Sequence, residues 1–304
     1  MSGGHSHGVS AASAHRGRLL AVLAITLVVL IAEIIASLIT GSLALLADAG
    51  HLFTDAAGVG LALLAVMAAG RPATPERSFG YLRLEILAAV VNALLLFGVA
   101  AFVLFEAVQR LNEPSEVSSG LMLVVATIGL AANGVSLALL RRGSSESLNV
   151  RGAYLEVLGD LLGSVAVVVA GVVIATTGYD RADAIASVLI ALLILPRTYK
   201  LLRDAVDILL EATPKGVDLN EVRRHIMETS GVVDVHDLHA WTITSGVPAL
   251  SAHVVIDERA MAEAKSGEIL DRLGDCLGEH FDISHCTFQL EPTGHAEHEH
   301  PVHD

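Results

Sequence analysis

The sequence predicts an all-α membrane domain of six helices followed by a small α+β domain. Two observations carry this prediction. The 304 residues are 53% hydrophobic and only 17% charged, with a mean hydropathy of +0.61, well above that of an ordinary soluble domain. The apolar residues gather in long runs over the first two thirds of the chain, whereas the last third is polar and acidic.

Six apolar runs predict a transmembrane domain over residues 18–210. The first run, from Leu19 to Ile39, holds one ionisable residue, Glu33, within the roughly 20 positions needed to cross about 30 Å of hydrocarbon. It is too long for a signal peptide and no small-residue cleavage site follows it, so we expect it to stay in the mature protein. The other runs, each bounded by Gly, Pro or charged residues, cover 43–69, 84–108, 119–140, 153–176 and 182–202.

Basic residues in the loops predict the orientation. The loops at 70–83 and 141–151 each carry three arginines, whereas those at 40–42, 111–120 and 176–180 carry no Lys or Arg. Because positively charged loops stay in the cytoplasm, both termini are expected to face it. The predicted location is therefore multi-pass, in a cell inner or plasma membrane.

A second, cytosolic domain is predicted over residues 211–292, after the break EATPKG. Helical spacing in VDLNEVRRHIMETS is followed by GVVDVHDLHAWTIT and PALSAHVVID, which are rich in β-branched and aromatic residues, with SGV as the turn between them. The segment AMAEAKSGEILDRLGDCLGEH returns to a helical period, and ISHCTFQLE is typical of a last strand. This αββαβ order predicts a small sheet with helices on one face and the other face free for a partner.

Both ends of the chain are rich in histidine. Residues 1–17 combine it with Gly, Ser and Ala, and are predicted to be disordered because they cannot bury enough surface to fold alone. Residues 293–304 form a polar tail that is expected to be unstructured. By composition, both tails are expected to collect metal ions weakly.

Charge and cysteine content narrow the function. The formal net charge of −14 is concentrated after Glu211, which argues against a nucleic-acid partner because phosphate binding needs Lys and Arg. An acidic cytosolic domain suits cations instead. The two cysteines, Cys276 and Cys286, are too few to form a disulfide framework, so a reducing compartment fits.

Four ionisable side chains stand out inside the apolar runs. His51 and Asp55 are spaced i,i+4 in the second run, and Glu156 and Asp160 repeat that spacing in the fifth, so each pair lies on one helical face. An ionisable group at membrane depth costs a few kcal/mol, and we expect no nearby buried Lys or Arg to neutralise these four. Packed together, the two helices would place one imidazole and three carboxylates around a point, a four-coordinate shell that suits zinc and similar cations.

Three other interpretations stay open from the residues alone. The four groups could be interhelical hydrogen-bond partners, which contribute about 0.6–2 kcal/mol per contact in membranes. An intramembrane metalloenzyme would need an open coordination position and a positioned general base, and the sequence contains no H-E-x-x-H motif. A membrane-anchored metal sensor would leave the buried ionisable residues without a role.

Four blocks of the sequence resemble the cation diffusion facilitator family, specifically its zinc/cobalt/cadmium efflux branch. The blocks are SLALLADAGHLFTDAAG, RPATPERSFGYLRLEILAAVVNALLLF, RGAYLEVLGDLLGSV and VHDLHAWTITSGVPALSAHVVID. The resemblance implies six transmembrane helices, a metallochaperone-like (ferredoxin-like) αββαβ domain in the cytosol and a homodimer. It also implies efflux of a divalent cation in exchange for protons by alternating access, with no enzymatic activity.

The resemblance also implies metal ligands. His51, Asp55 and Asp160 match the family's transport-site motifs, whereas Glu156 stands where zinc-selective relatives usually have histidine. A carboxylate is a harder ligand that favours oxygen-preferring cations, so the preferred metal, Zn²⁺ or a similar divalent cation, is left open. His51, whose ordinary pKa is about 6.5, is the natural proton carrier near neutral pH.

In the cytosolic domain the resemblance points to His236 and His253, with His285 and Glu291, as sites that promote closure of the dimer. The alternative is that these are solvated histidines on the surface of a soluble sheet. The same divalent ion would then be both substrate and, in this domain, a structural or regulatory ion.

Overall fold

The computed structural model describes residues 7–295 except 70, 142–147, 263–264 and 284. It divides into two compact units. The first holds the chain up to Leu61 and from Val91 to Leu202, and the second holds Ala62–Val90 and the chain from Arg203 onward.

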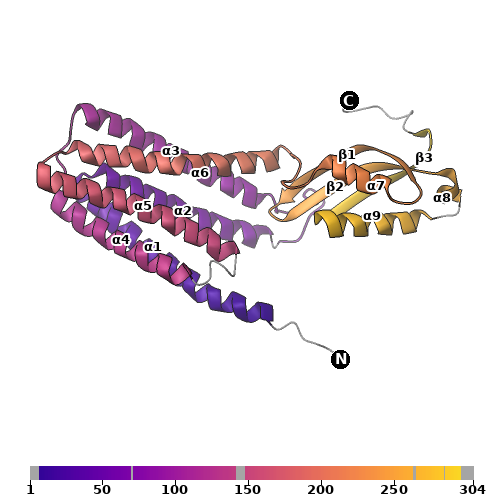
Figure 1. Cartoon of the computed structure of the whole chain (residues 1–304), viewed down its shortest axis with the longest axis horizontal. Coiled ribbons are helices and arrows are strands. Elements are labelled where there is room, and N and C mark those ends of the chain that lie inside the picture. The colour runs from indigo at the N-terminus through magenta and orange to yellow at the C-terminus, as the bar shows by residue number, and fades with distance from the viewer. Residues whose placement is uncertain (1–6, 70, 142–147, 263–264, 284, 296–304) are drawn as a thin grey trace. The chain divides into compact units, whose positions relative to one another are not determined.

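Each of the six predicted apolar runs forms one long helix (Figure 1). The helices are α1 (His7–Thr40), α2 (Leu43–Ala69), α3 (Leu84–Asn112), α4 (Ser119–Arg141), α5 (Leu148–Thr177) and α6 (Arg181–Leu209). Over their described residues, five are long and apolar enough to cross a membrane: α1 from Leu20, α3, α4, α5 from Ala153, and α6. The protein therefore has a helical membrane region, and the role of α2 as a sixth span is taken up below as a proposal.

The start of α1 differs from our prediction for the N-terminal tail. We expected disorder over residues 1–17, but the helix begins at His7. Once an apolar helix is nucleated, each further residue adds one backbone hydrogen bond at little cost, so a polar Ala- and Ser-containing flank can continue it. The remainder of that tail, residues 1–6, and residues 296–304 of the C-terminal tail lie outside the described part of the chain.

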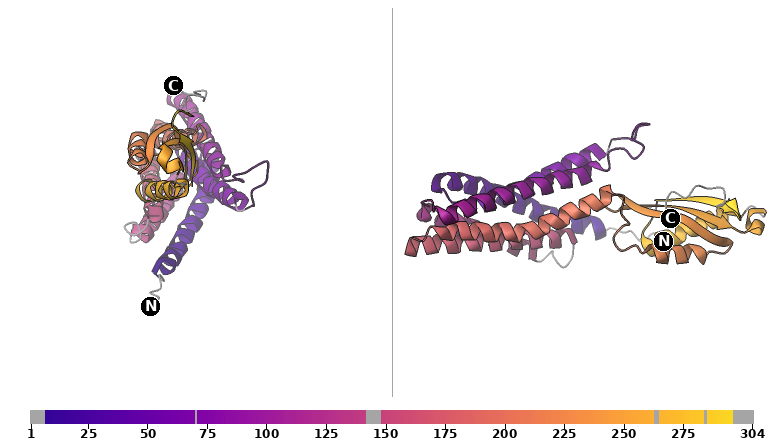
Figure 2. Two further views of the ribbon diagram at one scale, coloured as in Figure 1. Left: turned by 90° about the vertical axis from the view of Figure 1, so that its right-hand side faces the viewer. Right: turned by 90° about the horizontal axis from the view of Figure 1, so that it is seen from above.

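Small side chains fill the core of the first unit. The buried cluster that joins its helices includes Ala36 of α1, Ala44 of α2, Ala107 of α3, Ala126 of α4 and Ala170 of α5. Small residues allow helix backbones to approach closely, which is how helices associate where lipid removes the hydrophobic drive between them. The long helices consequently lie side by side (Figure 2), and large apolar residues are left on the outside, as a hydrocarbon solvent requires.

A carboxylate from α6 fixes the start of α2. Asp183 accepts hydrogen bonds from the Ser42 hydroxyl (2.5 Å) and from the backbone N–H groups of Leu43 (2.7 Å) and Ala44 (3.2 Å). These N–H groups have no partner within their own helix, and the positive end of the helix dipole favours a negative charge there. Arg110 of α3 lies 3.8 Å from the same carboxylate. The contact therefore ties the helix that carries His51 and Asp55 to α6.

The second unit contains a three-stranded sheet with helices on one face. In chain order its elements after α6 are α7 (Leu219–Met227), β1 (Val232–Thr244), β2 (Val247–Ile256), α8 (Glu258–Ala262), α9 (Ser266–Phe281) and β3 (His285–Pro292). The sheet order is β1-β2-β3, with β1 and β2 antiparallel and β2 and β3 parallel. A small α+β domain is confirmed, although the single second helix that we predicted is divided into the short α8 and the longer α9.

Side-chain alternation assigns the two faces of the sheet. The even-numbered residues of β2 from Leu250 to Ile256 belong to the core that α7 and α9 complete. Because successive side chains of a strand point to opposite faces, His253 and its odd-numbered neighbours face away from the helices. On β3, Phe288 and Leu290 pack toward the core, so Glu291 lies on the same open face as His253.

Candidate metal centres

Three of the four predicted membrane ligands converge between α2 and α5. His51 Nε2 lies 3.5 Å from an Asp55 carboxylate oxygen and 3.2 Å from an Asp160 carboxylate oxygen. Their side chains are 8%, 18% and 5% exposed, in the same order. All three potential ligand atoms lie within 4.8 Å of one another. The i,i+4 spacing brings the first two together, and helix packing supplies the third.

These separations suit a shared cation. A tetrahedral ion with bonds of about 2.0–2.1 Å holds its ligand atoms about 3.3 Å apart, close to the two distances from His51. The three residues also carry buried atoms without a hydrogen-bond partner among the described residues: His51 Nδ1, Asp55 Oδ2 and Asp160 Oδ1. Buried polar atoms without a partner are costly, and a bound cation would satisfy the two carboxylates.

Glu156 does not belong to the cluster that His51, Asp55 and Asp160 form in the described structure. Its Oε1 accepts from Arg197 Nη2 of α6 at 2.6 Å. We expected no nearby buried Lys or Arg beside the four groups; Arg197 is not buried, since its side chain is 53% exposed, yet it neutralises Glu156. The packing of α6 on α5 brings in a cation 41 residues further along the chain, and periodicity within one helix could not indicate that.

A row of polar side chains continues the site into the bundle. Ser164 lies one turn after Asp160 on α5, and its hydroxyl contacts Asp48 Oδ2 of α2 at 3.4 Å. The amide of Asn133 on α4 donates to the same hydroxyl at 3.1 Å. Two glycines leave room for nearby carboxylates: a Cβ at Gly163 would lie 2.9 Å from Asp48 Oδ1, and one at Gly129 would lie 2.9 Å from Glu33 Oε1.

A second cluster forms on the open face of the sheet. His236 and His253 are directly paired across β1 and β2. Glu291 of β3 reaches both rings, with one oxygen 3.2 Å from His236 Nε2 and the other 2.7 Å from His253 Nδ1. The Glu291 side chain is 2% exposed and the two histidines are 27% and 23% exposed. These three donors can hold a metal ion from the open side.

Asp237 lies beside this cluster. Its backbone φ is 47°, and it lies between His236 and His239, where the pairing register of β1 with β2 shifts. Its carboxylate lies 2.8 Å from His239 Nε2 and 3.7 Å from His253 Nε2. The hydrogen bond from His239, aided by the neighbouring His253 and His236, lowers the pKa of Asp237. The residue therefore adds negative charge at the edge of the cluster.

His285 does not join the other predicted cytosolic ligands. It pairs with Ala249 at the start of β3, whereas Glu291 pairs with Val255 at the far end. The six intervening steps of about 3.3 Å place the two residues about 20 Å apart along the strand. The His285 ring instead packs edge-to-face on Phe79, with centroids 5.8 Å apart.

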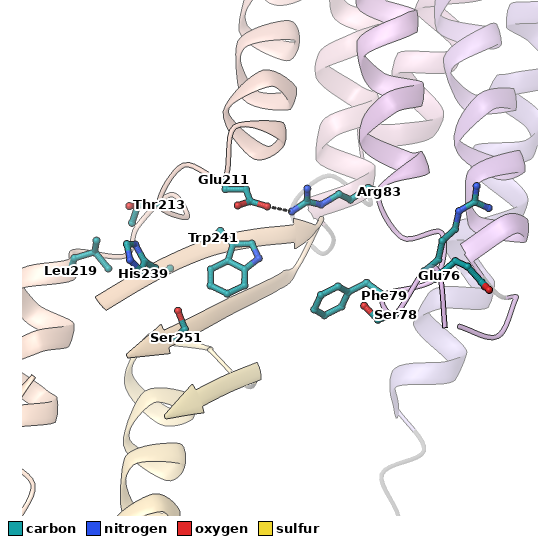
Figure 3. Close-up of a pocket in the computed structure, with 13 residues that line it drawn as sticks. Glu76, Ser78, Phe79, Arg83, Glu211, Thr213, Leu219, His239, Trp241 and Ser251 are labelled. Carbon is teal, nitrogen blue, oxygen red and sulfur yellow. Dashed lines mark hydrogen bonds and ion pairs between the residues drawn. The ribbon is translucent and has the colours of Figure 1, made fainter. Parts of the chain in front are cut away.

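The second unit also has a cleft of about 760 Å³ near that end of the sheet (Figure 3). Phe79, Trp241, His239 and Ser251 are among its lining residues, and an ion pair of 2.7 Å between Arg83 and Glu211 closes one side. Among its described lining residues, His239 is the sole histidine. Among the described residues, none of the groups whose ligand atoms lie close enough to share a metal ion lines this cleft.

A third group of donors was not predicted from the sequence. His225, Cys276 and His280 place one ligand atom each within 4.8 Å of the others on α7 and α9. His225 and Cys276 are 51 residues apart in the chain, so their spacing could not indicate this contact.

Together these features define a membrane protein that handles divalent cations. The chain belongs to the cation efflux family, whose members are transporters rather than enzymes. A family model described as the cation efflux transmembrane domain matches residues 19–210, and one described as the cytoplasmic domain of cation efflux proteins matches residues 214–293.

Three relatives are similar over most of their length. The metal cation efflux system protein CzcD of Cupriavidus metallidurans is 47% identical over 291 residues, covering 96% of this chain and 90% of that protein. The zinc transporter ZitB of Escherichia coli is 41% identical over 276 residues, covering 90% and 87%. A cadmium, cobalt and zinc/H⁺-K⁺ antiporter of Bacillus subtilis is 39% identical over 268 residues, covering 88% and 86%.

Proposed function

We propose that this chain exports a divalent cation, zinc and also cobalt or cadmium, from the cytoplasm in exchange for protons. The observation that carries the proposal is the buried cluster of His51, Asp55 and Asp160, whose nitrogen and oxygen atoms have the spacing of a metal shell. The names of the relatives support it, because they specify efflux of metal cations, transport of zinc and antiport with protons.

The arrangement of spans in this proposal uses all six long helices. α2 is the sixth span. Its 27 residues are long enough to cross the hydrocarbon, and its polar groups are turned inward to the cluster. The membrane domain then covers residues 18–210 and the cytosolic domain residues 211–292. The protein lies in the inner or plasma membrane of the cell, and both of its termini face the cytoplasm. Alternating access opens the cluster first to one side and then to the other.

Exchange with protons follows from the ligand chemistry. A metal needs deprotonated ligands, so its binding releases protons, and proton entry weakens its hold. His51 is the group whose ordinary pKa lies nearest to physiological pH. It touches both carboxylates of the cluster, so protonation of its ring places a positive charge where the cation was held.

We assign Glu156 as a fourth ligand that is available only when it leaves Arg197. It lies one helical turn before Asp160 on α5, so rotation of its side chain brings it toward the cluster. In the described conformation its charge is neutralised by the guanidinium. Exchange of one partner for the other would couple cation binding to the position of α6.

The cytosolic cluster is proposed as a second cation site that stabilises a homodimer. His236, His253 and Glu291 lie on the sheet face that the helices leave open. A cation there would remove the negative charge that opposes the approach of a second acidic domain. His285 stays outside this cluster and is assigned no ligand role in it.

Transport in purified proteoliposomes tests the main proposal. Zn²⁺ accumulation, followed with an internal fluorescent indicator, should depend on an imposed pH gradient and should fall at least about tenfold in Asp160→Asn. Accumulation that ignores the gradient would count against proton exchange. Metal binding without any flux would favour a membrane-anchored sensor, and consumption of a chemical substrate would favour an intramembrane metalloenzyme.

A further inference from the structure

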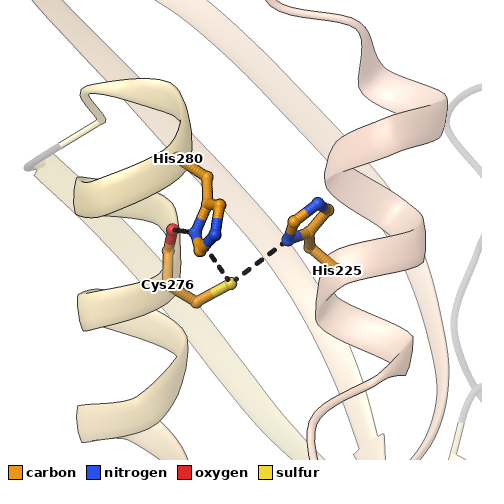
Figure 4. A group of neighbouring side chains, drawn as sticks. All are labelled: His225, Cys276 and His280. Carbon is orange, nitrogen blue, oxygen red and sulfur yellow. Dashed lines mark hydrogen bonds between the residues drawn. The ribbon is translucent and has the colours of Figure 1, made fainter.

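The helical side of the cytosolic domain carries a cluster of nitrogen and sulfur donors. His225 lies on α7, and Cys276 and His280 lie one turn apart on α9 (Figure 4). Both helices pack on the sheet face opposite to His253 and Glu291. This cluster is therefore separate from the one formed by the strands.

The distances suit a metal shell that includes sulfur. Cys276 Sγ lies 3.6 Å from His225 Nδ1 and 3.9 Å from His280 Nδ1. A tetrahedral zinc ion with Zn–S of about 2.3 Å and Zn–N of about 2.0–2.1 Å holds sulfur and nitrogen about 3.6 Å apart. The two imidazole rings are in contact, with centroids 4.8 Å apart and planes inclined by 52°. Small side-chain movements suffice to bring three ligands onto one ion.

We propose that His225, Cys276 and His280 form a metal site for a thiolate-preferring cation such as Zn²⁺, Cd²⁺ or Cu⁺. Thiolate and imidazole ligands select these ions over Mg²⁺, Ca²⁺ and Mn²⁺. The ion would link α7 to α9 and so stabilise the packing of these two helices in the domain. Water or a nearby carboxylate completes the coordination.

The surrounding charge favours a cation. Glu228 follows α7, where it pairs with Arg224 at 3.4 Å, and Glu279 lies beside His280 on α9, so two carboxylates lie near the Cys276 thiol. Nearby carboxylates attract a metal ion, and binding of the ion displaces the thiol proton. His280 Nδ1 also lies 2.9 Å from the Cys276 carbonyl oxygen, and this hydrogen bond is exchanged for the metal bond on binding.

The alternative is that the three side chains only pack together. His225 also stacks edge-to-face on Phe281, with centroids 5.1 Å apart, and aromatic contacts of this kind stabilise folds without any ligand. A pure packing role predicts no thiolate–metal bond. The spectroscopic signal of a thiolate–metal bond therefore distinguishes the two roles, whereas a measurement of stability does not.

Cadmium titration of the purified full-length protein separates them. The thiolate-to-cadmium charge-transfer band in the ultraviolet should appear in the wild type and in Cys286→Ser, and disappear in Cys276→Ser. Cys286 is a matched control because it lies on β3 and its thiol donates to the Ile283 carbonyl (3.4 Å). The number of cadmium ions bound per chain should fall by one in Cys276→Ser.

Two further variants make the result independent of folding and of transport. His225→Gln, which keeps a polar side chain on α7, should retain the fold by circular dichroism and weaken cadmium binding at the site at least about tenfold. Asp160→Asn should retain the band in full, because the membrane cluster holds no sulfur. A band that is missing from the wild type, or that persists in Cys276→Ser, would overturn the proposal whatever the outcome for transport.

Discussion

Arg197 holds Glu156 away from the membrane cluster, and its replacement by glutamine tests whether Glu156 is a ligand. The two side chains are 53% and 35% exposed, and their charged atoms are 2.6 Å apart. Where water reaches such an ion pair, the pair contributes about 1 kcal/mol at most, which corresponds to about a fivefold change in an equilibrium constant. A divalent cation can therefore compete with Arg197 for the carboxylate.

The expected result is a tighter cation site in Arg197→Gln, by up to about fivefold in Kd. Removing a positive charge also favours any nearby cation, so the effect has to be measured in a double-mutant cycle with Glu156→Gln. Calorimetric titration of Zn²⁺ into the four purified proteins gives the coupling. Arg203→Gln is the matched control, since Arg203 lies on the same helix and pairs with Asp207 at 3.9 Å.

Equal tightening in both backgrounds would refute the assignment of Glu156. The gain would then come from the lost charge of Arg197 alone, and water would complete the shell of His51, Asp55 and Asp160. A gain that is present only when Glu156 is intact supports exchange of the carboxylate between guanidinium and metal.

Three further predictions concern the membrane region. Asp160→Asn keeps the shape of a ligand but removes its charge, so Zn²⁺ flux in proteoliposomes should fall at least about tenfold at equal protein content. Gly163→Ala places a Cβ 2.9 Å from Asp48 Oδ1, whereas a Cβ at Gly159 meets no atom within 4 Å; Ala in a helix interior gains about 1 kcal/mol over Gly, so thermal unfolding should show that gain for Gly159→Ala and a smaller gain or none for Gly163→Ala, whose Cβ displaces the Asp48 carboxylate. Asp183→Ala removes the cap of α2 and should cost about 1–3 kcal/mol, seen as a lower unfolding temperature in detergent, and an unchanged temperature would contradict the capping role.

The solvent explains why the long helices could be predicted so closely. A segment that crosses hydrocarbon has to be apolar along its whole length and has to satisfy its backbone internally, so the runs at 84–108 and 119–140 predicted α3 and α4 to within a few residues. The helix over residues 7–17 was not predicted from the sequence. An apolar composition indicates which segments are buried or cross a membrane, and these residues form a helix without being apolar.

The ligand clusters were predictable only as far as local spacing reaches. The i,i+4 spacing paired His51 with Asp55, and strand alternation was consistent with His236 meeting His253. Alternation assigns His285 to the same face as Glu291 but says nothing of the distance along the strand. Contacts between elements, such as Arg197 with Glu156, depend on packing and were not indicated.

The two kinds of donor set fit two different tasks. An ion in transit has to bind strongly enough to enter and weakly enough to leave, and one imidazole with carboxylates meets that condition because protons compete with the metal for each ligand. The thiolate of Cys276 would bind Zn²⁺ or Cd²⁺ too firmly for release at every cycle. Sulfur is accordingly placed on α9, in the polar domain where a retained ion stabilises structure, and the His51 cluster has only nitrogen and oxygen donors.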